Sequence, residues 1–182
     1  MVRGLFWILA AVLLGGIVHL STVLAMPQAA KQDAYSRLAQ LTPVNAMMPL
    51  ATTKAGAEIM PFMDPAFAAA VCRYDLSDGP LKLITPLSQA YTSVTFYTRR
   101  SVAFYAINDR AAGRRTIELD LMTAAQHAQV PEDEEVTAAD RLIIESPTTM
   151  GLIVLRALAP EPGLMPMARQ ALATATCRTQ SQ

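Results

Sequence analysis

The sequence has few of the residues from which common catalytic and metal sites are built. It contains two histidines and two cysteines among 182 residues, and one of the histidines, His19, lies inside a long apolar run. His127 alone cannot form a two-histidine metal site. Phosphate-binding glycine loops and the G-x-S-x-G turn are also missing. We therefore predict no metal, no cofactor and no catalytic residue.

Charge is scarce and balanced. Fifteen basic and fifteen acidic side chains cancel, and charged residues make up 16% of the chain. Without a basic block, nothing predicts a nucleic-acid partner. The acidic run from Glu132 to Glu135 has neither the alternate spacing nor the glycine of a calcium loop. We interpret it as a solvated loop.

The longest feature that is present is the apolar run from Gly4 to Met26, which holds no charged side chain over 23 residues. As a helix it would extend about 34 Å, enough to cross a hydrocarbon core about 30 Å thick. Arg3 precedes the run, which favours a cytoplasmic amino end. We expect a single-pass inner-membrane protein whose C-terminal domain lies in the periplasm.

A cleaved signal peptide is the alternative interpretation of the same run. Its amino end is short and basic, and Val23 to Ala25 offer small residues at a cleavage spacing. Signal-peptide cores usually extend over about 7 to 15 residues, so the longer run favours an uncleaved anchor. Both interpretations export the rest of the chain.

Cys72 and Cys177 lie 105 positions apart in this exported part. An oxidising compartment makes pairing their default state, so we predict a disulfide between them. A reactive thiol is the alternative, but it would need a basic partner, and His127 is the one histidine available outside the apolar run.

The chain divides into three parts: an anchor at residues 1–26, a stalk helix and irregular wrap at 27–66, and a β-rich exported domain at 67–182. Short β-branched and aromatic runs broken by turn residues predict an antiparallel, sandwich-like β fold. Two hairpins are expected, one between 92–98 and 102–107 and one between 141–145 and 150–158. The apolar stripe at Met167 to Cys177 predicts a C-terminal helix that packs on the sheet and ends at Cys177.

Aromatic and arginine side chains gather between Tyr91 and Arg115. Strand alternation would put Tyr105 on the opposite face from Phe104, which limits how many of these side chains share a side. A packed core with a solvated rim is one interpretation, and a groove for a ligand or partner is the other. For the second we select the residues Tyr97, Arg99, Arg100, Tyr105, Asn108, Asp109 and Arg110.

Several short segments carry a family resemblance: Cys72 to Pro80, Thr98 to Arg100, Phe104 to Arg110, Leu155 to Ala157, and the closing Thr176 and Cys177. They resemble the short membrane-anchored members of the domain-of-unknown-function family DUF1254. The resemblance implies a β-sandwich, which in larger relatives precedes a second sandwich of family DUF1214. No settled reaction comes with it. This chain ends before such a second domain.

These observations together favour a non-catalytic binding or accessory module in the cell envelope. The alternative is an envelope enzyme acting on a lipid or a glycan. Because the resemblance is to the first half of a two-sandwich protein, we expect the membrane and a separate envelope protein that supplies the second sandwich as partners. The sequence names neither a ligand nor an oligomeric state.

Overall fold

The computed structural model describes residues 2–29, 33–51, 59–60, 63–113, 115–130 and 142–180. The chain divides into two compact units, residues 1–33 and residues 34–182. The acidic run at 132–135 lies outside the described residues, as does much of the segment predicted as an irregular wrap.

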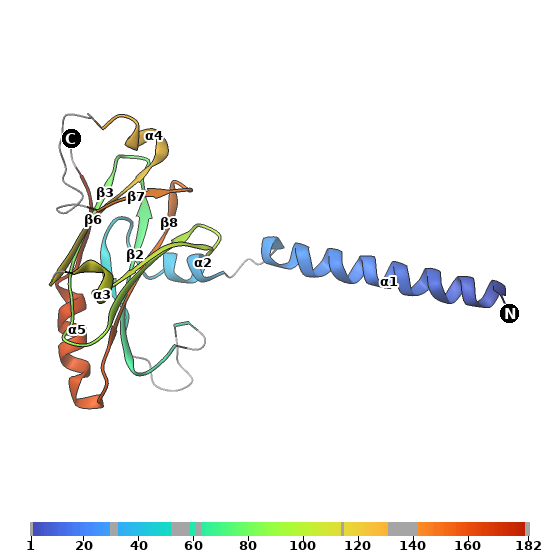
Figure 1. Ribbon diagram of the computed structural model, residues 1–182, viewed down its shortest axis with the longest axis horizontal. Helices are drawn as coiled ribbons and strands as arrows, with labels where there is room; N and C mark the ends of the chain where they lie inside the picture. The colour runs from blue at the N-terminus through green and yellow to red at the C-terminus, as the bar shows by residue number, and fades with distance from the viewer. Residues whose placement is uncertain are drawn as a thin grey trace. The chain divides into compact units, whose positions relative to one another are not determined.

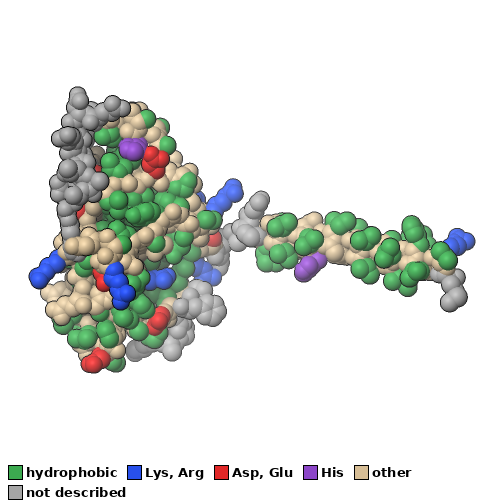
Figure 2. All heavy atoms as spheres, viewed as in Figure 1, with side chains coloured by type: hydrophobic (Ala, Val, Ile, Leu, Met, Phe, Trp, Pro, Cys, Tyr) green, Lys and Arg blue, Asp and Glu red, His purple; other side chains and the backbone are tan. Residues whose placement is uncertain are grey.

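The first unit is the helix α1 (Val2–Ala29). Its apolar part, Val2–Met26, is long enough to cross a membrane, and none of it is buried within the protein. Hydrophobic side chains cover both sides of the helix along its length (Figure 2). Among the described residues, α1 is thus the one candidate transmembrane helix, and it lies near the N-terminus as the sequence predicted.

The second unit consists of two β-sheets that pack face to face (Figure 1). We call the five-stranded sheet, in the order β1-β2-β8-β4-β5, sheet A. Its strands are β1 (Met47–Pro49), β2 (Phe67–Asp75), β4 (Thr92–Thr98), β5 (Ala103–Asn108) and β8 (Met150–Leu158), and every neighbouring pair is antiparallel. The mainly β, sandwich-like fold class predicted from the sequence is confirmed.

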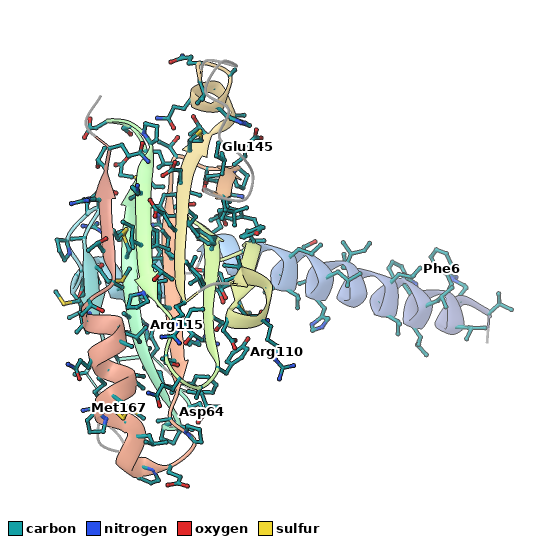
Figure 3. The ribbon with its side chains drawn as sticks, turned by 60° about the vertical axis from the view of Figure 1, so that its left-hand side comes forward. Phe6, Asp64, Arg110, Arg115, Glu145 and Met167 are labelled. Atoms are coloured by element: carbon teal, nitrogen blue, oxygen red, sulfur yellow. A yellow bond between two sulfur atoms is a disulfide. The ribbon has the colours of Figure 1, made fainter. Side chains whose placement is uncertain are left out.

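The second sheet, sheet B, has the order β7-β6-β3-β9. Its strands are β3 (Leu81–Pro86), β6 (Thr116–Thr123), β7 (Leu142–Ser146) and β9 (Thr176–Thr179), of which β6 and β7 are parallel. The short helices are α2 (Ala34–Ala39), α3 (Asp109–Ala112), α4 (Ala124–His127), η1 (Pro162–Leu164) and α5 (Met165–Ala173). In the views of Figures 1 and 3, α4 and α5 lie at opposite ends of the sheets.

Strand pairing differs from the prediction in one hairpin. The pair β4 and β5 forms a hairpin as expected, but β7 and β8 belong to different sheets. The turn between them carries the chain from sheet B to sheet A, and the turn after β2 makes the reverse crossing. A turn with the same residue types can close a hairpin or cross between layers, so the local sequence does not distinguish the two outcomes.

The C-terminal helix is also shorter than predicted. Helix α5 ends at Ala173, and the chain then enters β9, which carries Cys177. Pairing of Thr176 with Ile84 on β3 begins directly after the buried Ala175. Ala168 and Leu172 of α5 are buried against the core, so the packing role predicted for the helix is confirmed.

The core lies between the two sheets. Cys72 on β2 and Cys177 on β9 are joined by a disulfide, with their Cα atoms 6.4 Å apart, and both are buried. Because β2 belongs to sheet A and β9 to sheet B, this bond links the two layers. It is the pair predicted from the sequence, and a stable disulfide indicates an extracytoplasmic domain.

Asn45 forms a second link between the layers. Its Nδ2 donates to the backbone oxygen of Asp75 and to Oγ1 of Thr179, both at 2.8 Å, and its Oδ1 accepts from the backbone N–H of Asp75 at 2.8 Å. Asp75 ends β2 and Thr179 ends β9. Asn45 adopts a left-handed φ of 52°, which asparagine tolerates better than most residues. The Asn45 side chain, just before β1, thus connects the end of β2 in sheet A to the end of β9 in sheet B.

The outward face of sheet A is covered as well. Tyr35 and Leu38 of α2 are buried against Val71 of β2 and Leu152 of β8. The helix α2 (Ala34–Ala39) lies within the segment predicted to hold a stalk helix, and it packs on the domain. Sheet A has a second apolar cluster on this face, beneath α2.

Replacing Cys72 or Cys177 by serine is expected to destabilise the domain by about 4 to 5 kcal/mol, because the bond closes a loop of roughly 100 residues. Thermal unfolding of each variant measures the loss. In addition, the wild-type chain, denatured directly from cells without reductant, should bind no thiol reagent. Full labelling of both cysteines would contradict the pairing and the extracytoplasmic location together.

Candidate functional site

The residues selected from the sequence do not form one cluster. Tyr97, Arg99 and Arg100 lie at the turn that joins β4 to β5, whereas Asn108, Asp109 and Arg110 lie at the other end of β5. β5 has six residues, and a strand of that length extends about 20 Å. The set therefore divides into two groups at opposite ends of the edge strand of sheet A.

The group at the turn faces α2. The guanidinium carbon of Arg99 lies 4.0 Å from the centre of the Tyr35 ring, a cation–π contact. The Tyr97 side chain packs into the apolar cluster on the outward face of sheet A. Arg100 is exposed to solvent. Arg99 thus helps to hold α2 on the sheet, and Arg100 is available at the surface.

The group at the other end of β5 has largely structural contacts. Oδ1 of Asn108 accepts a hydrogen bond from the backbone N–H of Ala111 at 2.9 Å and caps α3. Oδ1 of Asp109 accepts from the backbone N–H of Thr92 at 3.5 Å. Arg110 is exposed and extends from α3 away from the sheets (Figure 3). Of these three residues, Arg110 has its charge free for a surface contact.

Tyr105 occupies a different face from the one that regular alternation predicts. The register between β4 and β5 shifts at Phe96 and Tyr97, so β5 contains a bulge. As a result, Phe104 and Tyr105 both pack against the central core, with ring centres 6.1 and 5.9 Å from that of Phe96. The extra residue of a bulge cancels the alternation of neighbouring side chains. The prediction that the two aromatics face opposite sides is therefore wrong.

A pocket of about 380 Å³ lies on the outward face of sheet A. We call it the outer pocket. Its floor consists of side chains from β2, β8 and β4, and its walls come from α2, from the chain before β2 and from the β4–β5 turn. It is lined by Ala34, Leu38, Leu50, Met60, Met63, Asp64, Phe67, Ala69, Val71, Tyr97, Ser101, Leu152, Val154 and Arg156.

Strand register fixes the layout of this floor. Ala69 lies opposite Arg156, Val71 opposite Val154, and Leu152 opposite Tyr97. Arg156 and Leu152 are four residues apart on β8, which corresponds to about 13 Å along a strand. The outer pocket therefore has Arg156 at one end, Tyr97 and Ser101 at the other, and aliphatic side chains between them.

Four lining residues carry polar side chains, and among the described residues only that of Asp64 has a hydrogen-bond partner. Oδ1 of Asp64 accepts from the backbone N–H of Ala66 at 2.9 Å. Arg156 forms no ion pair or hydrogen bond with the residues that the structure describes, and its side chain reaches solvent. Oγ of Ser101 is buried without a hydrogen-bond partner. A buried hydroxyl without a partner costs about 1 to 3 kcal/mol.

Ser101 also has an unusual backbone conformation. Its φ is 61°, in the left-handed region, at the last position of the β4–β5 turn. The turn is closed by hydrogen bonds from Ser101 N–H to Thr98 O at 2.9 Å and from Thr98 N–H to Val102 O at 2.8 Å. Glycine is the usual residue at such a position. The outer pocket is thus bordered by a serine that is disfavoured both by its backbone and by its unpaired hydroxyl.

A buried polar cluster lies on the core side of the same sheet. The Tyr74 hydroxyl donates to the Tyr97 backbone oxygen at 3.2 Å and lies 3.0 Å from Oγ of Ser146. Burial raises the pKa of Tyr74, which keeps the phenol protonated. Gly151 lies opposite Tyr74, where a Cβ would collide with the phenol and with the Tyr97 backbone. We interpret this cluster as structural.

His127 and the acidic side chains show no sign of a metal centre among the described residues. Nδ1 of His127 contacts Oε1 of Glu145, and both side chains are about half exposed. In the described part of the chain, no three His, Cys, Asp or Glu side chains come close enough to hold an ion. A second pocket, of about 340 Å³, lies between the loop at 86–90 and α5 and is also mainly apolar.

Sequence reasoning missed Ser101, Arg156 and Asp64 as pocket residues. Arg156 could have been noticed as the one charged residue in the apolar strand from Met150 to Leu158. Ser101 could have been noticed as a turn residue at a position that favours glycine. The pocket itself had no sequence signal, because its lining comes from residues between 34 and 156 that only the fold brings together.

Comparisons with known proteins agree with this fold. The family model described as "Protein of unknown function (DUF1254)" matches residues 45–179. No curated protein matches the sequence.

Solved structures that match the chain over most of its length include the following two. The VPA0106 protein from Vibrio parahaemolyticus is 13% identical, with a TM-score of 0.59 over 81% of this chain and 33% of that one. An uncharacterised protein from Burkholderia cenocepacia is also 13% identical, with a TM-score of 0.47 over 75% of this chain and 34% of that one. The chain thus spans about a third of the length of each. With most of its length covered by the family model, the chain belongs to the DUF1254 family.

Proposed function

We propose that this protein is a membrane-anchored binding or accessory module of the cell envelope. In this proposal α1 crosses the inner membrane once, and the two-sheet domain lies in the periplasm. The length of α1, the basic Arg3 ahead of it and the inter-sheet disulfide support that placement. The anchor stays attached, because its apolar run is longer than a typical signal-peptide core.

The observation that carries the binding role is the composition of the outer pocket. Ten of its lining side chains are aliphatic, thioether or phenyl groups, and the remaining four are Asp64, Tyr97, Ser101 and Arg156. Apolar walls with a few polar groups are typical of small-molecule sites, and about 380 Å³ falls within their usual size. A pocket of this kind binds a molecule without requiring chemistry on it.

The alternative role, an enzyme acting on a lipid or a glycan, has weaker support. A serine nucleophile needs a base within hydrogen-bond reach. Oγ of Ser101 has no such partner among the described residues. The carboxylate of Asp64 is engaged by a backbone N–H of its own turn. The polar groups of the outer pocket are therefore spread along its walls and do not converge on one point.

A bound molecule should remain with the protein when the full chain is extracted from membranes in a mild detergent. Native mass spectrometry is expected to show an added mass on the wild type. Val154→Trp, which fills the outer pocket, should lose that mass. Met167→Trp, which fills the second pocket beside α5 (Figure 3), is the matched control and should keep it.

Equal retention by the wild type and by Val154→Trp would remove the outer pocket as the binding site. Release of a chemically altered molecule during incubation would instead favour the enzyme. Thermal unfolding of both tryptophan variants verifies that each is folded, because overpacking can destabilise a domain by about 1 to 3 kcal/mol.

We further propose that a separate envelope protein supplies a second β-sandwich. This chain spans about a third of the VPA0106 protein, so the likeness leaves two thirds of that protein uncovered. The contact we propose is the segment from Tyr97 to Arg110. It contains β5, the edge strand of sheet A, with the exposed Arg100 and Arg110 at its two ends. Unpaired strand edges accept a further strand, and arginine is enriched at interface hot spots.

A photo-crosslinking amino acid at the exposed Val102 should capture that partner in intact membranes. The double variant Arg100→Ala and Arg110→Ala should reduce capture while leaving the melting temperature nearly unchanged, since exposed charges contribute little to stability. Arg169→Ala with Arg178→Ala, two exposed positions on α5 and β9, is the matched control. Undiminished capture by the first variant, or no captured protein at all, would contradict the proposed contact.

A further inference from the structure

We infer that the outer pocket binds a single-chain anionic amphiphile, with its apolar chain along the floor of the pocket and its anionic group on Arg156. The inference rests on the proposed binding function and assigns its ligand class. Three observations support it: the arrangement of side chains in the pocket, the absence of a partner for Arg156 among the described residues, and the strained backbone and unpaired hydroxyl of Ser101.

The floor of the outer pocket suits one extended chain. Val71, Val154 and Leu152 form a continuous aliphatic strip along β2 and β8, about 13 Å long between the positions of Arg156 and Leu152. Met60 and Met63 border the strip. Methionine side chains are flexible and adapt to ligands of varied shape. An apolar strip bordered by methionine fits an alkyl chain better than a sugar, which needs several hydrogen-bonding groups.

Arg156 provides the charge complement at one end of the strip. It projects from the central strand β8, on the same face as Val154 and Leu152, and lies opposite Ala69 and Ser93 on the two neighbouring strands. The carboxylate of Asp64, also in the pocket wall, does not form an ion pair with it. A guanidinium at the solvent end of an apolar strip binds carboxylate or phosphate with two parallel hydrogen bonds. Arg156 is thus placed to hold an anionic head group at the pocket mouth.

Ser101, at the end of the outer pocket away from Arg156, indicates that this end also belongs to a binding site. Glycine in its place would remove the strain of the left-handed backbone, and a turn ending in glycine would leave no hydroxyl unpaired. Strained residues that persist in a fold tend to mark binding sites. Ser101 and Tyr97 both line the outer pocket, at the end opposite Arg156.

A photoreactive fatty acid tests this ligand class. The full chain is reconstituted in phosphatidylcholine nanodiscs with palmitic acid that carries a diazirine in mid-chain, and the labelled peptides are identified by mass spectrometry. A second probe has the same diazirine chain but ends in a neutral alcohol. The extent to which each probe labels α1 measures how much of that probe has entered the bilayer. Relative to that standard, the acid should label the outer-pocket peptides of β2 and β8 about tenfold more than the alcohol.

Arg156→Gln should remove the preference for the acid, because the shorter, neutral amide keeps a polar side chain at the site but removes its positive charge. Arg178→Gln on β9, also exposed, is the matched control and should leave the preference intact. Since Arg156 reaches solvent, its replacement leaves the core unchanged. Equal labelling by acid and alcohol in the wild type, an acid preference that survives Arg156→Gln, or label confined to α1 and the pocket beside α5 would each overturn the inference.

The outcome is separable from that of the proposed function. A protein that retains an added mass in the outer pocket but shows no preference for the acid remains a binding module with a different ligand class. A protein that shows no added mass in native mass spectrometry and captures no probe in the outer pocket would contradict both the binding function and the ligand class.

Discussion

The structure depends on one constraint: sheet A is apolar on both faces and must be covered on both. Its central strand, β8, directs Ile153 and Leu155 toward sheet B and Leu152 and Val154 the other way. Each buried aliphatic side chain contributes about 1.5 to 3 kcal/mol relative to exposure. Sheet B covers the inner face, and α2 with Leu50, Ile59 and Met60 packs on the outer one. The outer cover leaves a hollow, and that hollow is the outer pocket.

The same constraint explains why the cross-links between the two sheets lie between β2 and β9. The disulfide and the Asn45 side chain both join β2, an interior strand of sheet A, to β9, an edge strand of sheet B. A four-residue edge strand makes few ladder hydrogen bonds by itself. The covalent bond and the asparagine hold it in place, and the strand in turn closes the core that sheet A needs on its inner side.

Much of this architecture could be predicted from the sequence, because strand alternation is a local signal. The strands β4, β5, β7 and β8 lie within one residue of the strands predicted from the sequence. The cysteine pair followed from export and from the presence of two cysteines in the exported part. What could not be predicted depends on contacts between distant segments. The crossing between β7 and β8 has the turn residues of a hairpin, and β9 is a strand because it pairs with β3, although its sequence continues a helical stripe. The bulge that turns Phe104 and Tyr105 to one side adds a single residue, which alternation cannot detect.

The candidate site was less predictable than the fold. The aromatic and arginine segment drew attention because its residues are close in sequence, yet β5 separates them into two groups. The outer pocket is lined by residues from α2, from β2 and the methionines before it, from the β4–β5 turn and from β8. Single polar residues such as Ser101 and Arg156 acquire meaning only when the fold shows what surrounds them.

The alkylation of two neighbouring introduced cysteines tests the account most directly. Ala69 lines the outer pocket, and the next residue, Ala70, is fully buried between the sheets. Both native cysteines are in the disulfide, so an introduced thiol is the only one free in the described part of the chain. In the full chain without reductant, Ala69→Cys should react with a small alkylating reagent about a hundredfold faster than Ala70→Cys, which must await opening of the core. Equal rates at the two positions, or an Ala69→Cys thiol that reacts only on unfolding, would contradict an open pocket on the outer face of sheet A.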